Sequence, residues 1–305
     1  MSGLLDPTSL RSVANQIGLR PTKTRGQNFV HDANTVRRIV ALAGVDAHDR
    51  VIEVGPGLGS LTLGLLETGA SVVAIEIDEL LAEQLPRTVG ERMPEAADRL
   101  DLVVSDALDL VVSDALDVVE LPPAGLSDNN GAGTSAPTAL VANLPYNVSV
   151  PVLLHMLELS DSWTTGLVMV QLEVADRLVA GPGSKVYGVP SAKLAWFAQA
   201  ERVGTVPAKV FWPVPNVESG LVRIVRRDPP PTSASRAQVF TVIDAAFASR
   251  RKMLRGALGG LCGGSARAAE LIDAAGVDPT ARGESLAVTD FAAIAEVLAR
   301  AGVWG

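Results

Sequence analysis

The chain has 305 residues, of which 48% are hydrophobic and 20% charged, with a formal net charge of −8. This composition excludes a disordered protein and predicts a well-buried core, and the length predicts about two structural units. A net negative charge taken alone also disfavours a nucleic-acid partner, so any RNA contact must come from local basic clusters.

Several other classes of protein are excluded by residue types. The single cysteine, Cys262, excludes a disulfide framework and a multi-cysteine zinc site, and the three scattered histidines form no HxxxH pair. The amino-terminal segment lacks a signal-peptide pattern, and Asn and Pro residues interrupt the uncharged segment 139–157. We therefore expect a monomeric, cytoplasmic protein with no metal and no membrane span.

The first strong element prediction in chain order is a helix within residues 31–44, HDANTVRRIVALAG. Either Asp32 or Asn34 supplies the N-cap side chain, and Gly44 ends the helix. The acidic Asp78, further along, is expected to cap a later helix in the same way.

Alternating strand and helix patterns follow from about residue 51 to residue 226. Short runs rich in Val, Ile and Leu predict buried strands, at 51–54, 71–76, 102–105, 139–142, 166–171 and 220–225. Leucines at helical spacing lie between the first strands, at 58–69 and 77–89. This alternation predicts an α/β fold with a doubly wound, mostly parallel sheet.

A second domain is predicted where this alternation stops. Three prolines follow Asp228, and the remaining residues show helical spacing and little strand pattern. We therefore expect domains at 1–228 and 229–305, the second being small and helical. Two irregular stretches lie in the first: the octapeptide DLVVSDAL occurs at 101–108 and again at 109–116, and the Gly-, Ser- and Pro-rich segment 122–137 is typical of a loop.

The strongest chemical motif is the segment GPGLGS at 55–60, between a predicted strand and a predicted helix. Its glycines, beginning with Gly55, let a ligand approach the backbone, and the helix offers free N–H groups. Glu76 ends the next strand, where a carboxylate can accept hydrogen bonds from ribose hydroxyls. The spacing GxGxG differs from the dinucleotide pattern GxGxxG, so the motif favours an adenosine cofactor without a pyrophosphate.

A second motif, Asn143-Leu144-Pro145-Tyr146, follows the strand predicted at 139–142. It therefore lies at the carboxyl edge of the sheet, where ligands of such folds bind. The Asn143 Oδ1 atom and a backbone carbonyl can accept both hydrogens of an exocyclic amine, and Tyr146 can stack on a planar ring. The alternative interpretation is a tight turn with a half-buried tyrosine.

Five motifs together carry a resemblance to a known family. They occupy residues 26–30, 53–62, 143–146, 210–219 and 247–255. In order and spacing the chain resembles the ribosomal RNA adenine dimethyltransferases, and the small-subunit (16S) group in particular, over about residues 10–300. The resemblance implies a Rossmann-like methyltransferase that uses S-adenosylmethionine to dimethylate N6 of two adjacent adenines, in a hairpin loop near the 3′ end of 16S rRNA, with a role in subunit biogenesis.

The resemblance also implies roles for individual residues. Asn28, Val30, Gly55, Glu76, Asn143 and one aspartate after LVVS would bind the methyl donor. Because of the octapeptide repeat, that aspartate is Asp106 or Asp114, and the distance from Glu76 favours Asp106. Asn143 and the Leu144 carbonyl would hold the target amine, with Tyr146 and Phe211 stacking on the extruded base; the alternative for Phe211 is a core position.

The densest basic cluster follows at the start of the second predicted domain. It contains Arg250, Arg251, Lys252 and Arg255, which we expect to bind rRNA phosphates; the alternative is a solvated or ion-paired surface. Residues Arg20, Lys23 and Arg25 form a second candidate cluster.

Three other functions remain open at this point. A related enzyme could methylate a large-subunit adenine and confer macrolide resistance, although 247–255 favours the small-subunit group. A nicotinamide oxidoreductase would need GxGxxG and leaves 143–146 unexplained. A non-catalytic ribosome assembly factor on the same fold would not need the complete donor motifs.

Overall fold

The computed structural model describes residues 3–21, 27–109 and 136–304. Contacts divide the chain into a first unit, Met1–Ala175 with Glu201–Val225, and a second unit, Asp176–Ala200 with Arg226–Gly305. The second unit thus includes a segment that the predicted boundary at residue 228 placed in the first. Its aromatic residues account for this, because Trp196 and Phe197 both pack edge-on against Phe240.

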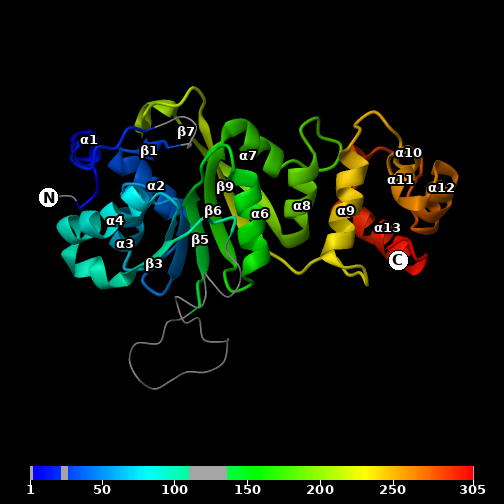
Figure 1. The fold of residues 1–305 in the computed structure, drawn as a ribbon, viewed down its shortest axis with the longest axis horizontal. Helices are drawn as coiled ribbons and strands as arrows, with labels where there is room; N and C mark the ends of the chain where they lie inside the picture. Colours follow the sequence, from blue (N-terminus) through cyan, green and yellow to red (C-terminus); the bar gives the residue numbers. More distant parts are fainter. Residues whose placement is uncertain (1–2, 22–26, 110–135, 305) are drawn as a thin grey trace, which may run out of the picture. The chain divides into compact units, whose positions relative to one another are not determined.

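A seven-stranded sheet forms the centre of the first unit (Figure 1), with the strand order β4-β3-β2-β5-β6-β9-β7. Its strands are β2 (Arg50–Val54), β3 (Ser71–Glu76), β4 (Leu100–Val104), β5 (Ala139–Asn143), β6 (Thr165–Gln171), β7 (Ala198–Val206) and β9 (Ser219–Arg226). All six predicted strands are present. The mainly polar β7, with no continuous apolar run, was not predicted. The strands from β4 to β6 in this order run parallel, and β9 runs antiparallel to β6.

The order in which the chain adds strands to the sheet reverses between β2 and β5. From β2 the chain moves outward through β3 and β4, and it then returns to the other side of β2 to form β5 and β6. Ligands of open α/β sheets bind at the carboxyl ends of the strands beside such a reversal. The topology therefore directs attention to the residues that follow β2 and β5.

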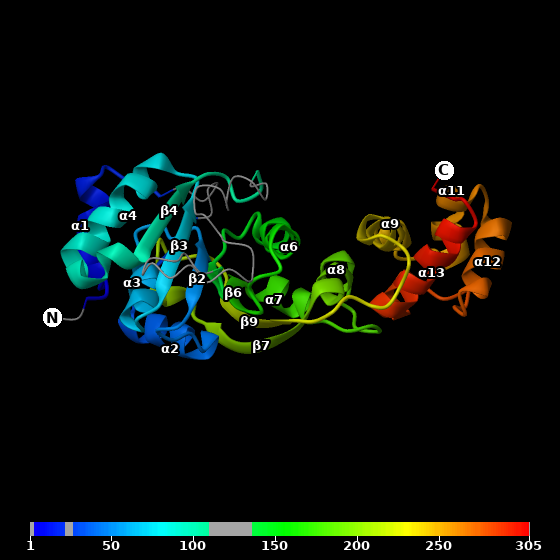
Figure 2. The same cartoon turned by 90° about the horizontal axis from the view of Figure 1, so that it is seen from below.

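Helices cover both faces of this sheet, with α2 and α6 on opposite sides in Figure 2. The helices of the first unit are α1 (Pro7–Gln16), α2 (Ala33–Ala43), α3 (Ser60–Glu67), α4 (Glu79–Arg92) and α6 (Ser149–Leu159), with α7 (Leu172–Leu178) at its end. The Asp32 carboxylate accepts from the Thr35 N–H at 2.7 Å, and Gly44 ends α2 in the left-handed conformation. Asp78 caps α4 by accepting from the Leu80 N–H. These cap predictions are confirmed, with Asp32 rather than Asn34 as the cap of α2.

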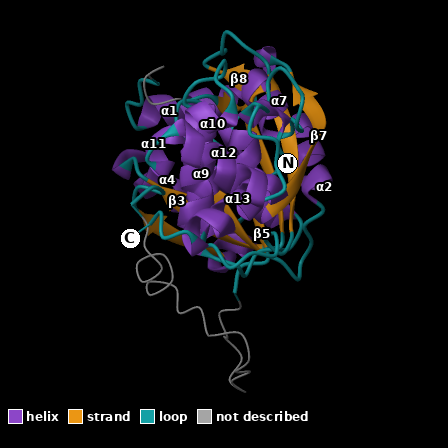
Figure 3. Cartoon of the chain, turned by 90° about the vertical axis from the view of Figure 1, so that its right-hand side faces the viewer, coloured by secondary structure: helices purple, strands orange, loops and turns teal. Residues whose placement is uncertain are grey.

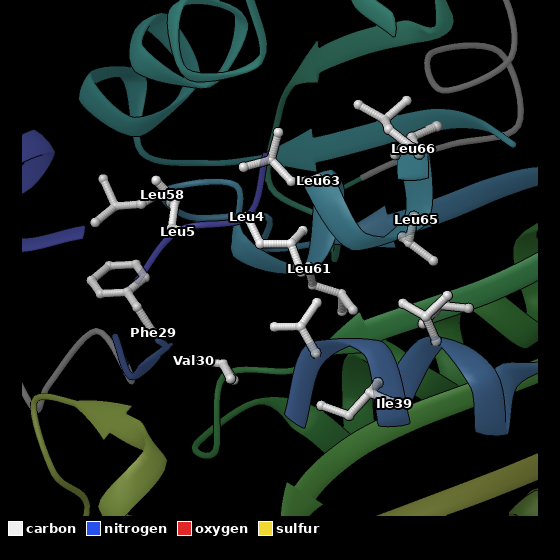
Figure 4. Packing of buried hydrophobic residues seen from close by; sticks show 14 of the residues in the cluster. Leu4, Leu5, Phe29, Val30, Ile39, Leu58, Leu61, Leu63, Leu65 and Leu66 are labelled. Carbon is white, nitrogen blue, oxygen red and sulfur yellow. The ribbon is translucent and has the colours of Figure 1, made fainter. Parts of the chain in front are cut away.

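The core of the first unit is packed most closely around α3 (Figure 4). Seven of its eight residues are buried, and Leu63 and Leu65 are 0% exposed. Helix α2 approaches it closely, because a Cβ atom on Gly64 would lie 2.4 Å from the Val36 side chain. The amino end of α3 is consequently held in a rigid environment, which matters for the site described below.

The helices from α8 onward belong to the second unit and are joined by loops (Figure 3). They are α8 (Val189–Phe197), α9 (Arg236–Phe247), α10 (Leu254–Ala257), α11 (Gly259–Cys262), α12 (Ser265–Ala274) and α13 (Val288–Arg300). Phe291 is fully buried and packs on Phe247, which contacts Tyr187. The predicted helical character of this region is confirmed.

The described ranges also contain three short 3-10 helices and a second, two-stranded sheet. The 3-10 helices are η2 (Pro94–Arg99), η3 (Ala208–Val210) and η4 (Gly283–Ser285), and the small sheet pairs β1 (Phe29–Val30) with β8 (Phe211–Trp212). None of the helices in the described ranges is both long enough and apolar enough to cross a bilayer.

Candidate active site

A cavity of about 640 Å³ lies at the carboxyl ends of β2, β3, β4 and β5, at the reversal point of the sheet. The structure brings to its wall all the predicted donor-binding residues that it describes: Asn28, Val30, Gly55, Glu76, Asp106 and Asn143. Asp114, the alternative to Asp106, lies outside the described residues. The walls come from segments spread between Gln27 and Met169, so the cavity forms only when the sheet is assembled.

The glycine-rich loop forms one wall of this cavity. Gly55 and Gly57 have positive φ angles of 70° and 58°, a conformation that favours glycine. Gly57 also lies against the ring of Phe29, since a Cβ atom there would be 2.5 Å from the ring. The loop leads into α3, whose amino end has no side-chain cap.

A buried hydroxyl lies at this amino end of α3. Ser60 is 6% exposed and lines the cavity, and its Oγ has no hydrogen-bond partner among the described residues. The first N–H groups of a helix also lack partners within the helix. Together these donors form a place for an anionic group such as a carboxylate.

Glu76 is held by two backbone N–H groups. Its Oε2 accepts from the Gly57 N–H at 3.1 Å, and its Oε1 accepts from the Asp78 N–H at 3.0 Å. Burial raises the pKa of the Glu76 carboxyl above its usual range, while the backbone hydrogen bonds oppose that rise. Each carboxylate oxygen can accept more than one hydrogen bond, so the oriented side chain can still receive ribose hydroxyls.

Glu53 was not predicted as an individual site residue. It is 1% exposed, it lines the cavity, and its Oε2 accepts from the Thr62 hydroxyl at 2.7 Å. Burial raises the pKa of Glu53 to about 8, and the nearby charge of Glu76 contributes to the rise. A carboxylate within the apolar run 51–54 is unusual in a buried strand, and this was the signal available in the sequence.

The charged residues of the cavity wall all carry the same sign. Within the described residues that line it, the ionisable side chains are Glu53, Glu76, Asp78, Glu79 and Asp106, and there is no Lys, Arg or His. A concentration of carboxylates in a partly closed cavity creates a negative potential. The cavity therefore suits a ligand with positive charge.

Asn143 lies on the cavity wall at the carboxyl end of β5. Its Nδ2 donates to the Asn28 carbonyl at 2.9 Å, which orients the amide so that Oδ1 is the atom able to accept a hydrogen bond. The next residue, Leu144, is buried, and its N–H donates to the Met169 carbonyl at 3.1 Å. The motif at 143–146 is therefore built onto β5 and β6 rather than placed on a free loop.

The two aromatic residues predicted to stack on a base have different surroundings. Tyr146 follows Pro145, a residue of the cavity wall, but does not itself line the cavity. It is half-buried, and its hydroxyl lies 2.7 Å from the Ser219 hydroxyl. Phe211 is fully buried in the hydrophobic cluster, opposite Val30 in the β1–β8 pairing, and it does not line the cavity. Phe211 therefore takes the core alternative, and the structure does not bring it to the site.

The predicted RNA-binding cluster lies in the second unit, with Arg250, Arg251 and Lys252 in the turn between α9 and α10 and Arg255 in α10. All four of its cationic residues are exposed. Arg250 donates to the Lys185 carbonyl at 2.8 Å, and its guanidinium lies 3.9 Å from a carboxylate oxygen of Glu284. Arg250 thus ties the turn to a neighbouring loop of the same unit, and exposed Lys185 adds a further cation nearby.

The doubly wound sheet, the glycine-rich loop, the acidic cavity and the motif at 143–146 together define a methyltransferase of the Rossmann-like class. Residues 19–300 match the family described as "Ribosomal RNA adenine dimethylase". The chain therefore belongs to the ribosomal RNA adenine dimethylase family, and it is an rRNA adenine dimethyltransferase by that membership.

Relatives and solved structures agree with this family. The chain is 69% identical to Ribosomal RNA small subunit methyltransferase A of Cutibacterium acnes over 99% of this chain and 96% of that protein. It is 58% identical to the protein of the same name from Streptomyces coelicolor, over 96% of each. A dimethyladenosine transferase structure from Plasmodium falciparum shares the fold, with a TM-score of 0.69 at 19% identity over 90% of this chain and 98% of that one.

Proposed function

We propose that the protein transfers two methyl groups from S-adenosylmethionine to N6 of each of two adjacent adenines in a hairpin loop near the 3′ end of small-subunit rRNA. The single observation that carries the chemistry is the position of Asn143, which lines the acidic cavity and has its amide oriented by Asn28. The names of the relatives support the small subunit as the substrate.

The residues of the cavity match the separate chemical groups of this methyl donor. The donor carries a sulfonium, an ammonium and a carboxylate, so its net charge is positive. The carboxylates of the wall suit the positive groups, and the unpartnered Ser60 hydroxyl with the amino end of α3 suits the donor carboxylate. Glu76 is oriented to accept from the ribose hydroxyls, and Asp106 lines the cavity near the end of β4, where it can accept from the adenine amine.

Asn143 and Leu144 then act on the target adenine. The N6 lone pair of adenine is delocalised into the ring and is a poor nucleophile. If Asn143 Oδ1 and the Leu144 carbonyl each accept one N6 hydrogen, the nitrogen becomes pyramidal and its lone pair points toward the donor cavity. S-adenosylmethionine, when bound, supplies a methyl group that its sulfonium already activates. Holding the reactants in line in this way supplies up to about 7–11 kcal/mol of the barrier reduction.

The target adenine must leave its stack to reach Asn143. Tyr146 follows Asn143 by three residues and is half-buried, so part of its ring is open to a base. Stacking on an aromatic ring returns about 1–3 kcal/mol per base. We assign this role to Tyr146 and no longer to Phe211.

The second unit supplies phosphate contacts in this proposal. Arg251 and Lys252 are exposed in one short turn, and Arg255 is exposed in α10, which follows it. The hydrogen bond from Arg250 to the Lys185 carbonyl brings exposed Lys185 beside this turn. Positive residues in such a cluster bind RNA phosphates with release of counterions. An acidic protein can thus bind rRNA through one local surface.

The decisive experiment incubates the protein with labelled S-adenosylmethionine and undermethylated small ribosomal subunits, and maps the modified nucleotides. We expect two adjacent dimethylated adenines in a hairpin loop near the 3′ end of the RNA. Methylation of large-subunit rRNA instead would show the macrolide-resistance activity. Binding of small subunits without any methylation would show a non-catalytic assembly factor.

A further inference from the structure

A hydrogen bond joins two motifs that are far apart in the sequence. The hydroxyl groups of Tyr146 and Ser219 lie 2.7 Å apart, although the residues are separated by 73 positions. Tyr146 follows the end of β5, and Ser219 is the first residue of β9. This hydrogen bond therefore connects the target-base motif to the strand at the far side of β6.

Ser219 is a rigid point of attachment. It is 0% exposed and pairs with Gln171 in the antiparallel ladder between β6 and β9. The preceding residue is also fixed, because the Leu172 N–H donates to the Glu218 carbonyl at 3.0 Å. Next to it, a Cβ atom on Gly220 would lie 2.4 Å from Ala175, so the backbone has no room to shift.

Tyr146, in contrast, is only half-buried and has two side-chain dihedrals. A hydrogen bond at Oη fixes the first of these dihedrals, χ1, and therefore where the ring lies. Because Oη lies on the axis of the second dihedral, the bond acts on that dihedral only through the preference of the hydroxyl for the plane of the ring. Burial raises the pKa of the Tyr146 hydroxyl, so it stays protonated at physiological pH and available for this bond. Either hydroxyl can be the donor, and in both cases the bond holds the far end of the ring at one place.

We propose that Ser219 is a positioning residue, which holds the ring of Tyr146 in the place needed to stack on the extruded adenine. This inference rests on the proposed function, and it adds to it a residue from outside the motif at 143–146. Ser219 acts through Tyr146 and touches neither the donor nor the reacting nitrogen.

The kinetic test compares Ser219→Ala, Tyr146→Phe and the double variant in the full chain. Each single variant removes the same hydrogen bond, so each should lower the single-turnover rate of methyl transfer to small subunits by about 2- to 10-fold, with unchanged affinity for S-adenosylmethionine. The double variant should be no slower than either single variant, because the two residues act as one unit. Effects that multiply would overturn the proposal.

A spectroscopic test follows the ring itself. The chain contains two tyrosines, Tyr146 and Tyr187, so labelling with 3-fluorotyrosine gives two fluorine resonances, which Tyr146→Phe assigns. Ser219→Ala should shift or broaden the Tyr146 resonance alone. Tyr187 donates to the Leu286 carbonyl at 2.8 Å in the second unit and serves as the internal reference. An unchanged Tyr146 resonance in Ser219→Ala would overturn the proposal.

A matched control separates positioning from loss of stability. Ser191 is also a buried serine, 2% exposed, and its hydroxyl donates to the Arg177 carbonyl. Ser191→Ala should lower stability while leaving the Tyr146 resonance and the transfer rate within about 2-fold of wild type. The two proposals can fail separately. If wild-type protein methylates no small-subunit adenine, the proposed function is wrong. If Ser219→Ala still shifts the Tyr146 resonance in that case, the conclusion that Ser219 holds the ring stands.

Discussion

The donor side and the target-base side of the site are held in place by different kinds of interaction. On the donor side, Glu76 is oriented by the N–H groups of Gly57 and Asp78, which belong to neighbouring turns. On the target-base side, Asn143 is oriented by Asn28, 115 positions away, and Tyr146 by Ser219. The contacts that orient Glu76 therefore come from the turns that follow β2 and β3, whereas the contacts that orient Asn143 and Tyr146 come from segments far away in the sequence.

This difference explains why the donor motif is readable as a short pattern. The strand, the glycine turn and the helix follow one another directly between Arg50 and Glu67, and local backbone geometry decides their shape. The target-base side draws on β1, β5, β6 and β9, so its parts become neighbours only through the strand order. Variants on the donor side should accordingly lose donor affinity, whereas variants on the target-base side should lose rate of methyl transfer.

The largest effect is expected on the target-base side. Asn143→Ala removes the acceptor for the N6 hydrogen, and the single-turnover rate of methyl transfer should fall by about 100-fold or more, as when one preorganised transition-state partner is removed. RNA affinity should change little, since the interaction develops in the transition state. Asn15→Ala, at an exposed position of α1 that does not line the cavity, is the control. Normal chemistry with impaired RNA binding would contradict the proposed role.

A smaller effect, confined to donor affinity, is expected on the donor side. Glu76→Ala should weaken binding of S-adenosylmethionine by about 10- to 100-fold, because a carboxylate hydrogen bonded to ribose is removed. Calorimetry measures this directly, and Glu83→Ala, an exposed residue of α4, is the control. Unchanged affinity would remove Glu76 from the site.

The same titration decides between the two copies of the octapeptide. Because Asp106 lines the cavity, Asp106→Ala should weaken donor binding by about 10-fold, and Asp114→Ala should leave it unchanged. The reverse result would transfer the role to Asp114.

Glu53 gives the donor side a pH dependence that the target-base side lacks. Its pKa is about 8 in the folded protein against an ordinary value of 4.5, so between these two pH values the unfolded chain has released a proton that the folded protein keeps. The contribution of Glu53 to the free energy of unfolding therefore falls as the pH rises from about 4.5 to 8, and it stays constant above pH 8.

Glu53→Gln removes this titration. The free energy of unfolding of the variant should gain on that of wild type as pH rises through this window, reaching on the order of 1–2 kcal/mol at pH 8. Urea unfolding at pH 5 and pH 8 measures the difference. A constant difference between the two proteins at both pH values would show that Glu53 is already charged when folded.

The smallest effects are expected in the second unit, where the side chains are exposed. Replacing Arg251 and Lys252 together by Ala should reduce the slope of log affinity for small subunits against log salt by roughly 0.7–0.9 for each phosphate that is no longer bound, with donor affinity unchanged. Arg250→Ala should instead lower thermal stability, because it frees the Lys185 carbonyl. An unchanged slope in the double variant would locate the RNA elsewhere. The next candidate is the cluster of Arg20, Lys23 and Arg25, of which Lys23 and Arg25 lie outside the described residues.

The sequence by itself determined the elements that depend on neighbouring residues. The apolar runs identified six strands, the caps Asp32 and Asp78 located two helix starts, and the glycine-rich turn with Glu76 located the donor cavity. Each of these features depends on backbone geometry and on the pattern of side chains within a few residues. A single sequence is therefore enough to predict them.

Only the tertiary structure decided the properties that depend on packing and pairing across the sheet. It placed Phe211 in the core, because β8 pairs with β1 and turns that ring inward, and it added β7, whose polar sequence gives no apolar run. It also raised the pKa of Glu53 by burial and brought Ser219 to Tyr146. Burial and long-range pairing are properties of the whole assembly, and no local pattern in the sequence records them.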